Sequence, residues 1–183
     1  MFGTGVSVAV PDLDRTDYLM ILGANPYASN GSVCTAPDFP GRIEAIRARG
    51  GKVVVVDPRR TRTAEEADQW IAIRPATDAL FLMAIVNVLF AENLVKIQDH
   101  IAPLLNGLDE VREASQEFTP ERVAHATGLE PEVMRQVARE LSAAKTAALY
   151  GRIGTTTTEF GTTVSWLVDV VNTLTGNLDS VGG

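Results

Sequence analysis

Short, uninterrupted apolar runs alternate with longer amphipathic stretches along this chain. The runs are residues 18–22, 53–56, 70–73 and 146–150. An apolar run of this length is typical of a strand that is buried on both faces of a parallel sheet. Between the first two runs, residues 40–49 place Ile43 and Ile46 three positions apart among charged residues, and Gly50 and Gly51 follow as a helix stop. These stretches predict a βαβ unit.

Helical periodicity dominates the rest of the chain. Residues 79–92 predict an apolar helix whose inward stripe is expected at Leu80, Met83, Ala84, Asn87 and Phe90. Residues 94–127 predict short amphipathic helices, and residues 132–144 and 160–174 predict two longer ones. A threonine followed three residues later by an acid is a helix-start signature, which we assign to Thr63.

The connection between the third and fourth strands is long, so the fourth strand can cross over and lie beside the first. The expected fold is therefore α/β, with an open, mostly parallel, Rossmann-like sheet of about four strands in the order 3-2-1-4 and helices on both faces. Residues 17–183 form one predicted domain. Residues 1–16 lack helical periodicity and are interpreted as a leading segment from a preceding part of a longer protein.

Composition narrows the function classes. The 183 residues are 45% hydrophobic, which is sufficient for one buried core. No apolar run approaches the roughly 18 residues of a membrane span, so no membrane partner is expected. The 16 basic and 23 acidic residues give a net charge of −7, which argues against nucleic acid as a partner. No export signal is recognisable, so we expect a cytoplasmic location unless such a signal lies upstream.

The chain offers few residues for metal binding or nucleophilic catalysis. Its single cysteine, Cys34, excludes an internal disulfide, and it is interpreted as an ordinary loop thiol. His100 and His125 are 25 positions apart and are interpreted as surface or capping residues. We therefore predict no metal site and no catalytic residue within the chain.

Ligands of an open parallel sheet bind beyond the carboxyl ends of its strands. Here the first strand is followed by a loop that begins at Gly23, and the second is followed by Asp57. Glycine allows a phosphate or sugar close to the backbone, and an acid can accept two ribose hydroxyls. However, the GxGxxG fingerprint is absent, and 34 positions separate Gly23 from Asp57 where roughly 20 are usual. The alternative is that both residues only close their strands.

Two further stretches have both a functional and a structural interpretation. Asp78 precedes the apolar helix and can either bind a ligand or, like Thr77, cap that helix. Gly151 and Gly154 follow the fourth strand and precede four threonines. Glycines and hydroxyls at a helix start can bind an anion, and they can equally form a flexible turn.

An ordered series of motifs resembles the molybdopterin oxidoreductases of the dimethyl-sulfoxide-reductase type, which include formate dehydrogenases and nitrate reductases. The motifs are residues 23–26, 57–64, 67–68, 74–80, 118–121, 126–128, 138–140 and 174–178. Members of that family hold molybdenum or tungsten between two molybdopterin guanine dinucleotides. The resemblance implies that this chain is one of the two related α/β domains that bind that cofactor.

The resemblance also implies roles for the loops after the first and fourth strands. Gly23, Asn25 and Pro26 would line the dinucleotide. Gly151 and Gly154 would approach its pyrophosphate or its pterin. Both loops would then border one crevice at the carboxyl end of the sheet.

Four more residues receive cofactor-binding roles from the resemblance. Asp57 would hold the guanosine ribose hydroxyls, and Arg59 and Thr61 would lie near a phosphate or the sugar. Asp78 would accept the N1 and N2 hydrogens of guanine. A carboxylate suits this last role because guanine presents two adjacent donors and adenine does not.

The chain also departs from the family pattern. Ala76 stands where the family commonly has glycine, and Cys34 does not match the metal-ligand position. The family's iron–sulfur cysteines, its metal ligand and its other cofactor-binding domain belong to segments outside this one. We therefore expect a fragment that is inactive alone and whose partners are the remaining domains of a parent oxidoreductase.

The expected function is binding of the guanosine end of the cofactor, within an enzyme of two-electron chemistry on formate, nitrate or a similar substrate. One alternative is a non-catalytic scaffold domain of a respiratory-complex subunit that keeps the fold without the metal. Another is an adenine or nicotinamide dinucleotide domain, which the missing fingerprint disfavours. A preference for guanine, no nucleotide binding and a preference for adenine would distinguish the three.

Overall fold

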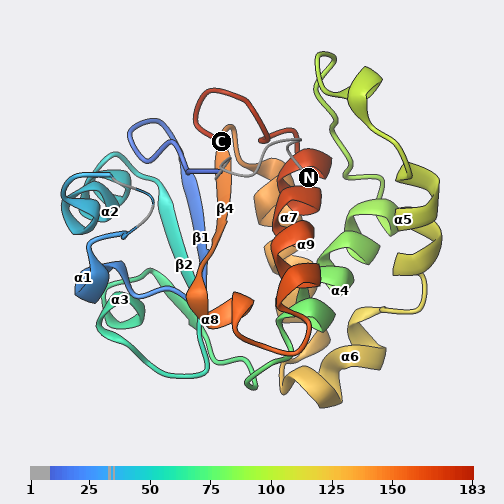
Figure 1. Cartoon of the computed structure of the whole chain (residues 1–183), viewed down its shortest axis with the longest axis horizontal. Coiled ribbons are helices and arrows are strands. Elements are labelled where there is room, and N and C mark those ends of the chain that lie inside the picture. Colours follow the sequence, from blue (N-terminus) through green and yellow to red (C-terminus); the bar gives the residue numbers. More distant parts are fainter. Residues whose placement is uncertain (1–8, 33, 35) are drawn as a thin grey trace.

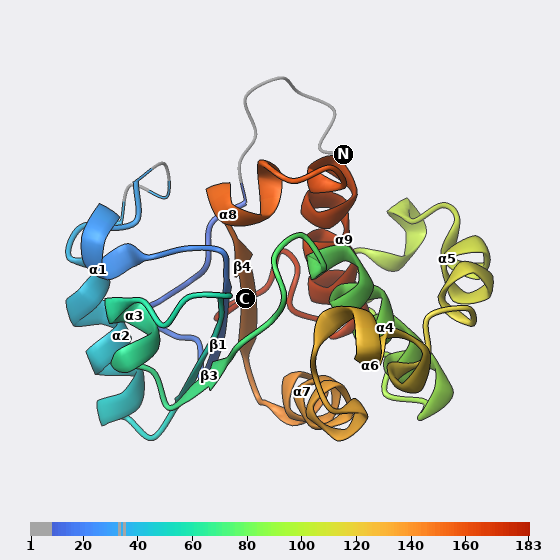
Figure 2. The same cartoon turned by 90° about the horizontal axis from the view of Figure 1, so that it is seen from below.

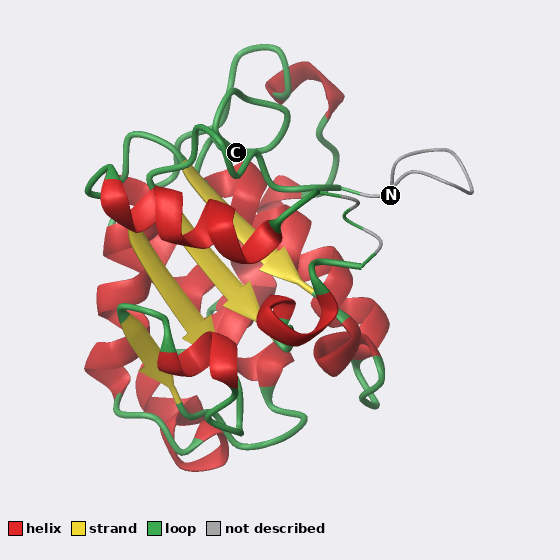
Figure 3. Ribbon diagram, turned by 90° about the vertical axis from the view of Figure 1, so that its left-hand side faces the viewer, coloured by secondary structure: helices red, strands yellow, loops and turns green. Residues whose placement is uncertain are grey.

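The central element of the fold is one parallel sheet. The structure is a computed structural model that describes residues 9–32, 34 and 36–183. Its strands run in the order β3-β2-β1-β4, which confirms the expected order (Figures 1 and 3). They are β1 (Tyr18–Leu22), β2 (Lys52–Val56), β3 (Gln69–Ile71) and β4 (Ala147–Gly151). All neighbouring strands are parallel, so their carboxyl ends share one edge of the sheet.

Helices cover both faces of the sheet, as the sequence predicts, so the sheet is the middle layer of three (Figure 1). One outer layer holds α1 (Pro26–Ser29), α2 (Phe39–Ala48) and α3 (Arg62–Glu65). The other holds α4 (Asp78–Ala91), α7 (Pro131–Ala143) and α9 (Gly161–Leu174). Outside α4 lie α5 (Leu108–Ser115) and α6 (Pro120–Thr127), and two short turns are η1 (Ala102–Leu104) and α8 (Ile153–Thr156).

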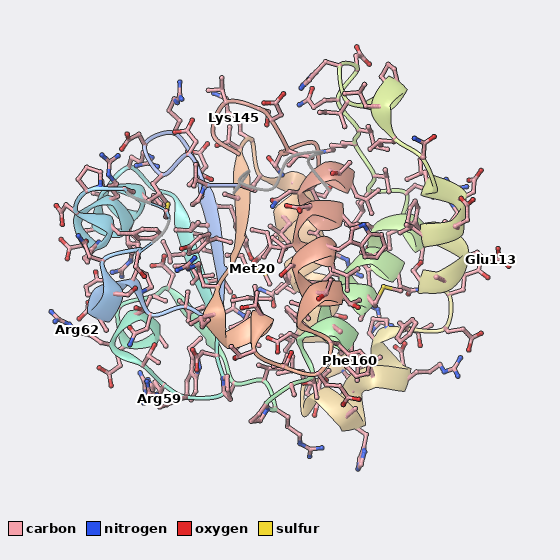
Figure 4. The ribbon with its side chains drawn as sticks, viewed as in Figure 1. Met20, Arg59, Arg62, Glu113, Lys145 and Phe160 are labelled. Carbon is pink, nitrogen blue, oxygen red and sulfur yellow. The ribbon has the colours of Figure 1, made fainter. Side chains whose placement is uncertain are left out.

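Strand β1 is buried over its whole length because it pairs with β2 on one side and β4 on the other. Successive side chains of a strand point to opposite faces. Met20 and Leu22 therefore join the core cluster beneath α4, α7 and α9, whereas Leu19 and Ile21 join the cluster beneath α2. Met20 lies at the centre of the molecule in Figure 4.

The predicted inward stripe of the apolar helix is confirmed only at Ala84, which is fully buried, and is wrong at its other four positions. In α4, Phe81, Leu82 and Ile85 are fully buried, whereas Leu80 and Met83 are only partly buried. The reason is that α4 contacts α5, α6, α7 and α9, so neighbours surround most of its circumference. A helix that is apolar on nearly all sides has no single stripe that marks its buried face.

A polar network joins α7 to the amino end of the sheet. Glu140 accepts hydrogen bonds from Lys52 Nζ, at 2.7 and 2.8 Å, and from the Tyr18 hydroxyl, at 3.0 Å. Burial, with the Glu140 charge next, raises the pKa of Tyr18. Burial also acts to raise the pKa of Glu140, but its hydrogen bonds, that from Lys52 first, outweigh burial and lower this pKa. The network lies at the opposite end from the candidate site.

The outer edge of β4 bonds to asparagine side chains instead of to another strand. Asn172, on α9, accepts from the backbone amide of Leu149 and donates to its carbonyl oxygen, both at 2.9 Å. Asn177 accepts from the amide of Ala147 at 2.9 Å. These side chains satisfy backbone groups that an edge strand otherwise leaves open.

Residues 9–16, the described part of the predicted leading segment, pack against the sheet and the carboxyl terminus. Leu13 is buried in the core cluster beneath α2. Asp12 donates its backbone amide to the carbonyl oxygen of Gly183 at 2.9 Å and accepts from the amide of Gly182 at 3.0 Å. The two ends of the described chain therefore lie side by side.

The loops that leave β1 and β4 are in direct backbone contact. The amide of Gly154 donates to the carbonyl oxygen of Gly23 at 2.9 Å, and the amide of Arg152 donates to that of Leu22 at 3.1 Å. A Cβ atom on Gly154 would lie 2.7 Å from the Gly23 oxygen, and one on Gly23 would lie 2.7 Å from the amide nitrogen of Thr155. Only glycine permits this approach, which we call the Gly23–Gly154 junction.

The burial of α4 predicts a large cost for truncating its side chains. We expect Ile85→Ala to lower the free energy of unfolding by about 2–5 kcal/mol, because it removes buried methyl groups and leaves a cavity. Chemical denaturation measures this change. Leu104→Ala is the control, since 73% of that side chain is exposed, and a loss in Ile85→Ala no larger than in the control would contradict the assignment.

The Gly23–Gly154 junction predicts that a single methyl group is harmful there. We expect Gly154→Ala to lower the free energy of unfolding by about 1–3 kcal/mol, because the new Cβ overlaps the Gly23 backbone. Thr156→Ala, an exposed position of the same short helix, is the matched control. Equal midpoints for the two variants in thermal unfolding would show that the loops can separate without cost.

Candidate functional site

The predicted site residues follow the carboxyl ends of the strands. Figure 2 views the molecule from this side, where α1, α3 and α8 lie around the strand ends. In Figure 4, Arg59 and Arg62 lie near this end of the sheet and Lys145 lies near the other. The topology therefore brings the loops after β1, β2 and β4 to one edge, as a parallel sheet requires.

Asp57 follows β2 directly and is held by a local turn. Its Oδ1 accepts from the backbone amide of Arg59 at 2.8 Å, and its carbonyl oxygen accepts from Trp70 Nε1 at 2.9 Å. The guanidinium of Arg60 in turn lies over the Trp70 ring, 5.7 Å from the ring centroid. One carboxylate oxygen therefore orders the loop, and among the described residues the other makes no hydrogen bond.

Asp78 is the first residue of α4, and only 7% of its surface is exposed. The preceding residue, Thr77, makes no side-chain cap, because its hydroxyl donates to the carbonyl oxygen of Arg74 at 2.7 Å. Burial raises the pKa of Asp78, a hydrogen bond with its own backbone lowers it, and the charge of Asp57 raises it. Neither Thr77 nor Asp78 therefore serves as the predicted cap, and the two carboxylates lie close enough to interact.

Asn25 and Pro26 connect β1 to α1. Pro26 is buried at the start of that helix. Asn25 makes no cap either, since its Oδ1 accepts from the hydroxyl of Thr63 at 2.7 Å. The same hydroxyl accepts from the backbone amide of Tyr27 at 3.2 Å. Thr63 therefore bridges the loop after β1 and the segment after β2.

The helix-start assignment to Thr63 is wrong by two residues. Helix α3 begins at Arg62, and Thr61 is its N-cap, accepting from the amide of Ala64 at 3.3 Å. The backbone at Thr61 is extended, which is the conformation that an N-cap requires. The hydroxyl of Thr61, a predicted cofactor contact, is thus engaged with the helix.

The arginines around α3 differ in their surroundings. The guanidinium of Arg62 lies 5.3 Å from the centroid of the Tyr27 ring. Arg59 is exposed, and in the part of the chain that the structure describes its guanidinium makes no hydrogen bond or ion pair. A guanidinium next to the end of β2 is suited to an anion.

The segment after β4 uses its polar groups internally. The hydroxyls of Thr155, Thr156, Thr157 and Thr158 each donate to a backbone carbonyl oxygen of the same segment. The amide of Gly154 is engaged by Gly23. Gly154 thus has a definite packing role, whereas Gly151 is the last residue of β4, and the contact of both with a pyrophosphate or pterin stays a prediction.

The remaining candidates for reactive chemistry lie elsewhere. Cys34 is buried, and burial, the largest effect, raises the pKa of its thiol, which disfavours the reactive thiolate. His100 and His125 are exposed. In residues 9–32, 34 and 36–183, no three histidine, cysteine, aspartate or glutamate side chains cluster as a metal site would require. Over the same residues, no helix is both long and apolar enough to cross a membrane.

The sequence reasoning missed three residues that shape this edge. The sequence predicts Thr63 only as a helix start and Trp70 only as a strand residue. The backbone amide of Tyr27 had no assignment at all. Their contacts join positions 13 to 38 residues apart, and these pairings become visible only after the strand ends are brought together.

The chain is similar to known proteins over almost its whole length. The chain matches the family model described as molybdopterin oxidoreductase over residues 2–183. It is 31% identical over 173 residues to formate dehydrogenase H of Escherichia coli, covering 94% of this chain and 23% of that protein. It is 28% identical over 195 residues to the molybdopterin-containing subunit of the arsenate respiratory reductase of a Shewanella species, covering 94% of this chain and 22% of the relative.

A solved structure is similar in fold. The acetylene hydratase of Pelobacter acetylenicus matches with a TM-score of 0.82 and 23% identity, over 94% of this chain and 23% of the hydratase chain. This chain thus spans about a quarter of the proteins that it resembles. Because the family model matches almost the whole chain, the chain belongs to the molybdopterin oxidoreductase family.

Proposed function

We propose that this chain is the domain of a molybdenum or tungsten oxidoreductase that binds the guanosine end of a molybdopterin guanine dinucleotide. The observation that carries the proposal is the pair of carboxylates at the carboxyl edge of the sheet. Asp78 is buried, its pKa is raised, and the charge of Asp57 acts on it. A buried carboxylate that has a raised pKa and does not cap its helix is a candidate for ligand binding.

The chemistry of the donors and acceptors fits guanosine. Asp78 would accept the N1 and N2 hydrogens of the base, and Asp57 would accept the ribose hydroxyls through the oxygen that the Arg59 amide leaves open. Arg59 would contact a phosphate, for which its exposed guanidinium is suited. Thr61 would contribute to this site indirectly, as the N-cap of α3.

The loops after β1 and β4 would supply the floor of the site. The Gly23–Gly154 junction holds the two loops against each other, because neither glycine places a side chain between the backbones. Pro26 and Gly151 border the same loops. The resemblance supports contact of Gly151 and Gly154 with the pyrophosphate or pterin.

The parent protein would carry out the chemistry. When bound, the molybdopterin and its metal would supply two-electron redox reactions on formate, nitrate or a similar substrate. This chain would bind and orient the dinucleotide. The remaining domains would be its partners and would supply the other half of the cofactor site, the metal ligand and an iron–sulfur cluster.

The guanine assignment predicts base selectivity. We expect the chain to bind GDP at least about tenfold more tightly than ADP, because two hydrogen bonds to a charged acceptor exist only with guanine. Asp78→Asn should remove the difference, because an amide cannot accept both hydrogens. Isothermal titration calorimetry measures the affinities.

Asp109→Asn is the matched control, because it makes the same charge change on an exposed side chain of α5. It should leave the GDP preference intact. Failure of GDP and ADP to bind even at about millimolar concentration would favour the scaffold function. Preference for ADP would favour an adenine dinucleotide domain.

The raised pKa of Asp78 predicts that acid weakens guanosine binding. Only the ionised carboxylate accepts both base hydrogens, so the affinity should fall as the pH falls through the folded-state pKa of Asp78. Because burial raises this pKa, the loss should begin above the pH at which an ordinary aspartate, of pKa about 3.9, takes up a proton. Guanosine is the suitable ligand because it has no phosphate that titrates in this range.

Asp78→Asn provides the comparison. The part of the pH dependence that Asp78 causes should be absent in this variant, because an amide does not take up a proton in this range. Equal pH profiles for the wild type and Asp78→Asn would show that another group controls binding.

A further inference from the structure

Thr63 is more completely buried than the residues on which the proposed function rests. Only 1% of its surface is exposed, although it is polar and follows the first residue of α3. Its hydroxyl is not used by the helix that contains it. Instead it contacts Asn25, in the loop after β1, and Tyr27, in the helix α1 that follows this loop.

The direction of these two hydrogen bonds follows from the number of hydrogens. A hydroxyl has one hydrogen and two lone pairs. The amide of Tyr27 can only donate, so it occupies a lone pair of Thr63 Oγ1 at 3.2 Å. The single hydrogen of Thr63 is then free to be donated to Asn25 Oδ1 at 2.7 Å. Successive bonds of this kind polarise and strengthen each other.

This relay determines which end of the Asn25 side chain remains available. Its oxygen is engaged by a buried group, so its Nδ2 group is the end left to contact a ligand. Among the described residues, Nδ2 makes no hydrogen bond, and the side chain is partly exposed. Asn25 therefore offers two N–H donors beside the Gly23–Gly154 junction.

We propose that Thr63 is a positioning residue that holds Asn25 as a donor to a phosphate oxygen of the bound nucleotide. The inference rests on the proposed function, in which Asp57 accepts the ribose hydroxyls. An N–H donor suits an acceptor that carries no hydrogen, and among such acceptors on a nucleotide the charged phosphate oxygens form the strongest hydrogen bonds. Thr63 lies in the segment after β2, and both partners of its hydroxyl, Asn25 and Tyr27, follow β1, so it links the two segments.

The test compares three single variants of the 183-residue chain. Thr63→Val keeps the size of the side chain and removes the hydroxyl, whereas Thr63→Ser keeps the hydroxyl. Thr175→Val is the matched control: its hydroxyl also donates and accepts, to Val171 O and from Asn177 Nδ2, each at 2.8 Å, but beyond the far end of α9. Calorimetry measures the affinities for GDP, ADP and guanosine, and NMR measures the side-chain amide resonances of Asn25.

In Thr63→Val we expect the affinities for GDP and ADP each to fall about fivefold or more, because a phosphate contact is lost from both. The affinity for guanosine should stay unchanged. Thr63→Ser should restore diphosphate binding, and Thr175→Val should bind like the wild type even if it is less stable. The Asn25 amide resonances should shift in Thr63→Val and return in Thr63→Ser.

Three results would overturn the inference while leaving the proposed function standing. The first is that Thr63→Val binds GDP as tightly as the wild type does. The second is that Thr63→Val loses as much affinity for guanosine as for GDP. The third is that Thr63→Ser does not restore the affinity for GDP. Absence of any nucleotide binding by the wild type would instead refute the proposed function, and the role of Thr63 with it. Loss of guanine preference without loss of diphosphate binding would concern Asp78 rather than Thr63.

Discussion

Burial of β1 on both faces is the constraint on which the rest of the molecule depends. A strand with no polar side chain facing solvent must have a neighbour on each edge and a helical layer on each face. Here β2 and β4 supply the edges, and α2 on one side and α4, α7 and α9 on the other supply the layers. Because all these strands are parallel, the same constraint gathers their following loops at one edge.

The chemistry of that edge depends on contacts between loops more than on any single loop. The Gly23–Gly154 junction sets the distance between the loops after β1 and β4. Thr63 does the same for the loop after β1 and the segment after β2. At the same edge, burial first and the charge of Asp57 as a smaller effect raise the pKa of Asp78. The site is therefore positioned by hydrogen bonds between segments that follow different strands.

Much of the architecture could be predicted because its signals are local. Runs such as residues 53–56 identify buried strands directly, and the long crossover before β4 gives the strand order. The buried face of α4 could not be predicted, because a helix surrounded by neighbours carries apolar residues on all sides. The assignment of the helix start to Thr63 also failed, since the cap is Thr61, which has no acid three residues after it and is marked by its extended backbone.

The candidate site shows the same division between local and distant information. The family resemblance supplied roles for Asp57 and Asp78, and strand topology brought their loops to one edge. The engagement of Asn25 by Thr63 depends on a pairing 38 positions apart, and the Gly23–Gly154 junction on one across most of the chain. Such pairings cannot be read from the periodicity of the sequence. Each depends on where the intervening helices bring the next strand and its loop.

The asparagines on the outer edge of β4 have a consequence for assembly. Asn172 occupies both the amide and the carbonyl of Leu149, and Asn177 occupies the amide of Ala147. A fifth strand would have to displace these side chains before it could pair with β4. The sheet is thus closed to extension on this side, which protects the chain from edge-to-edge self-association. Any neighbouring domain has to pack here through side chains, so the surface of α9 and not the backbone of β4 determines what can adjoin it.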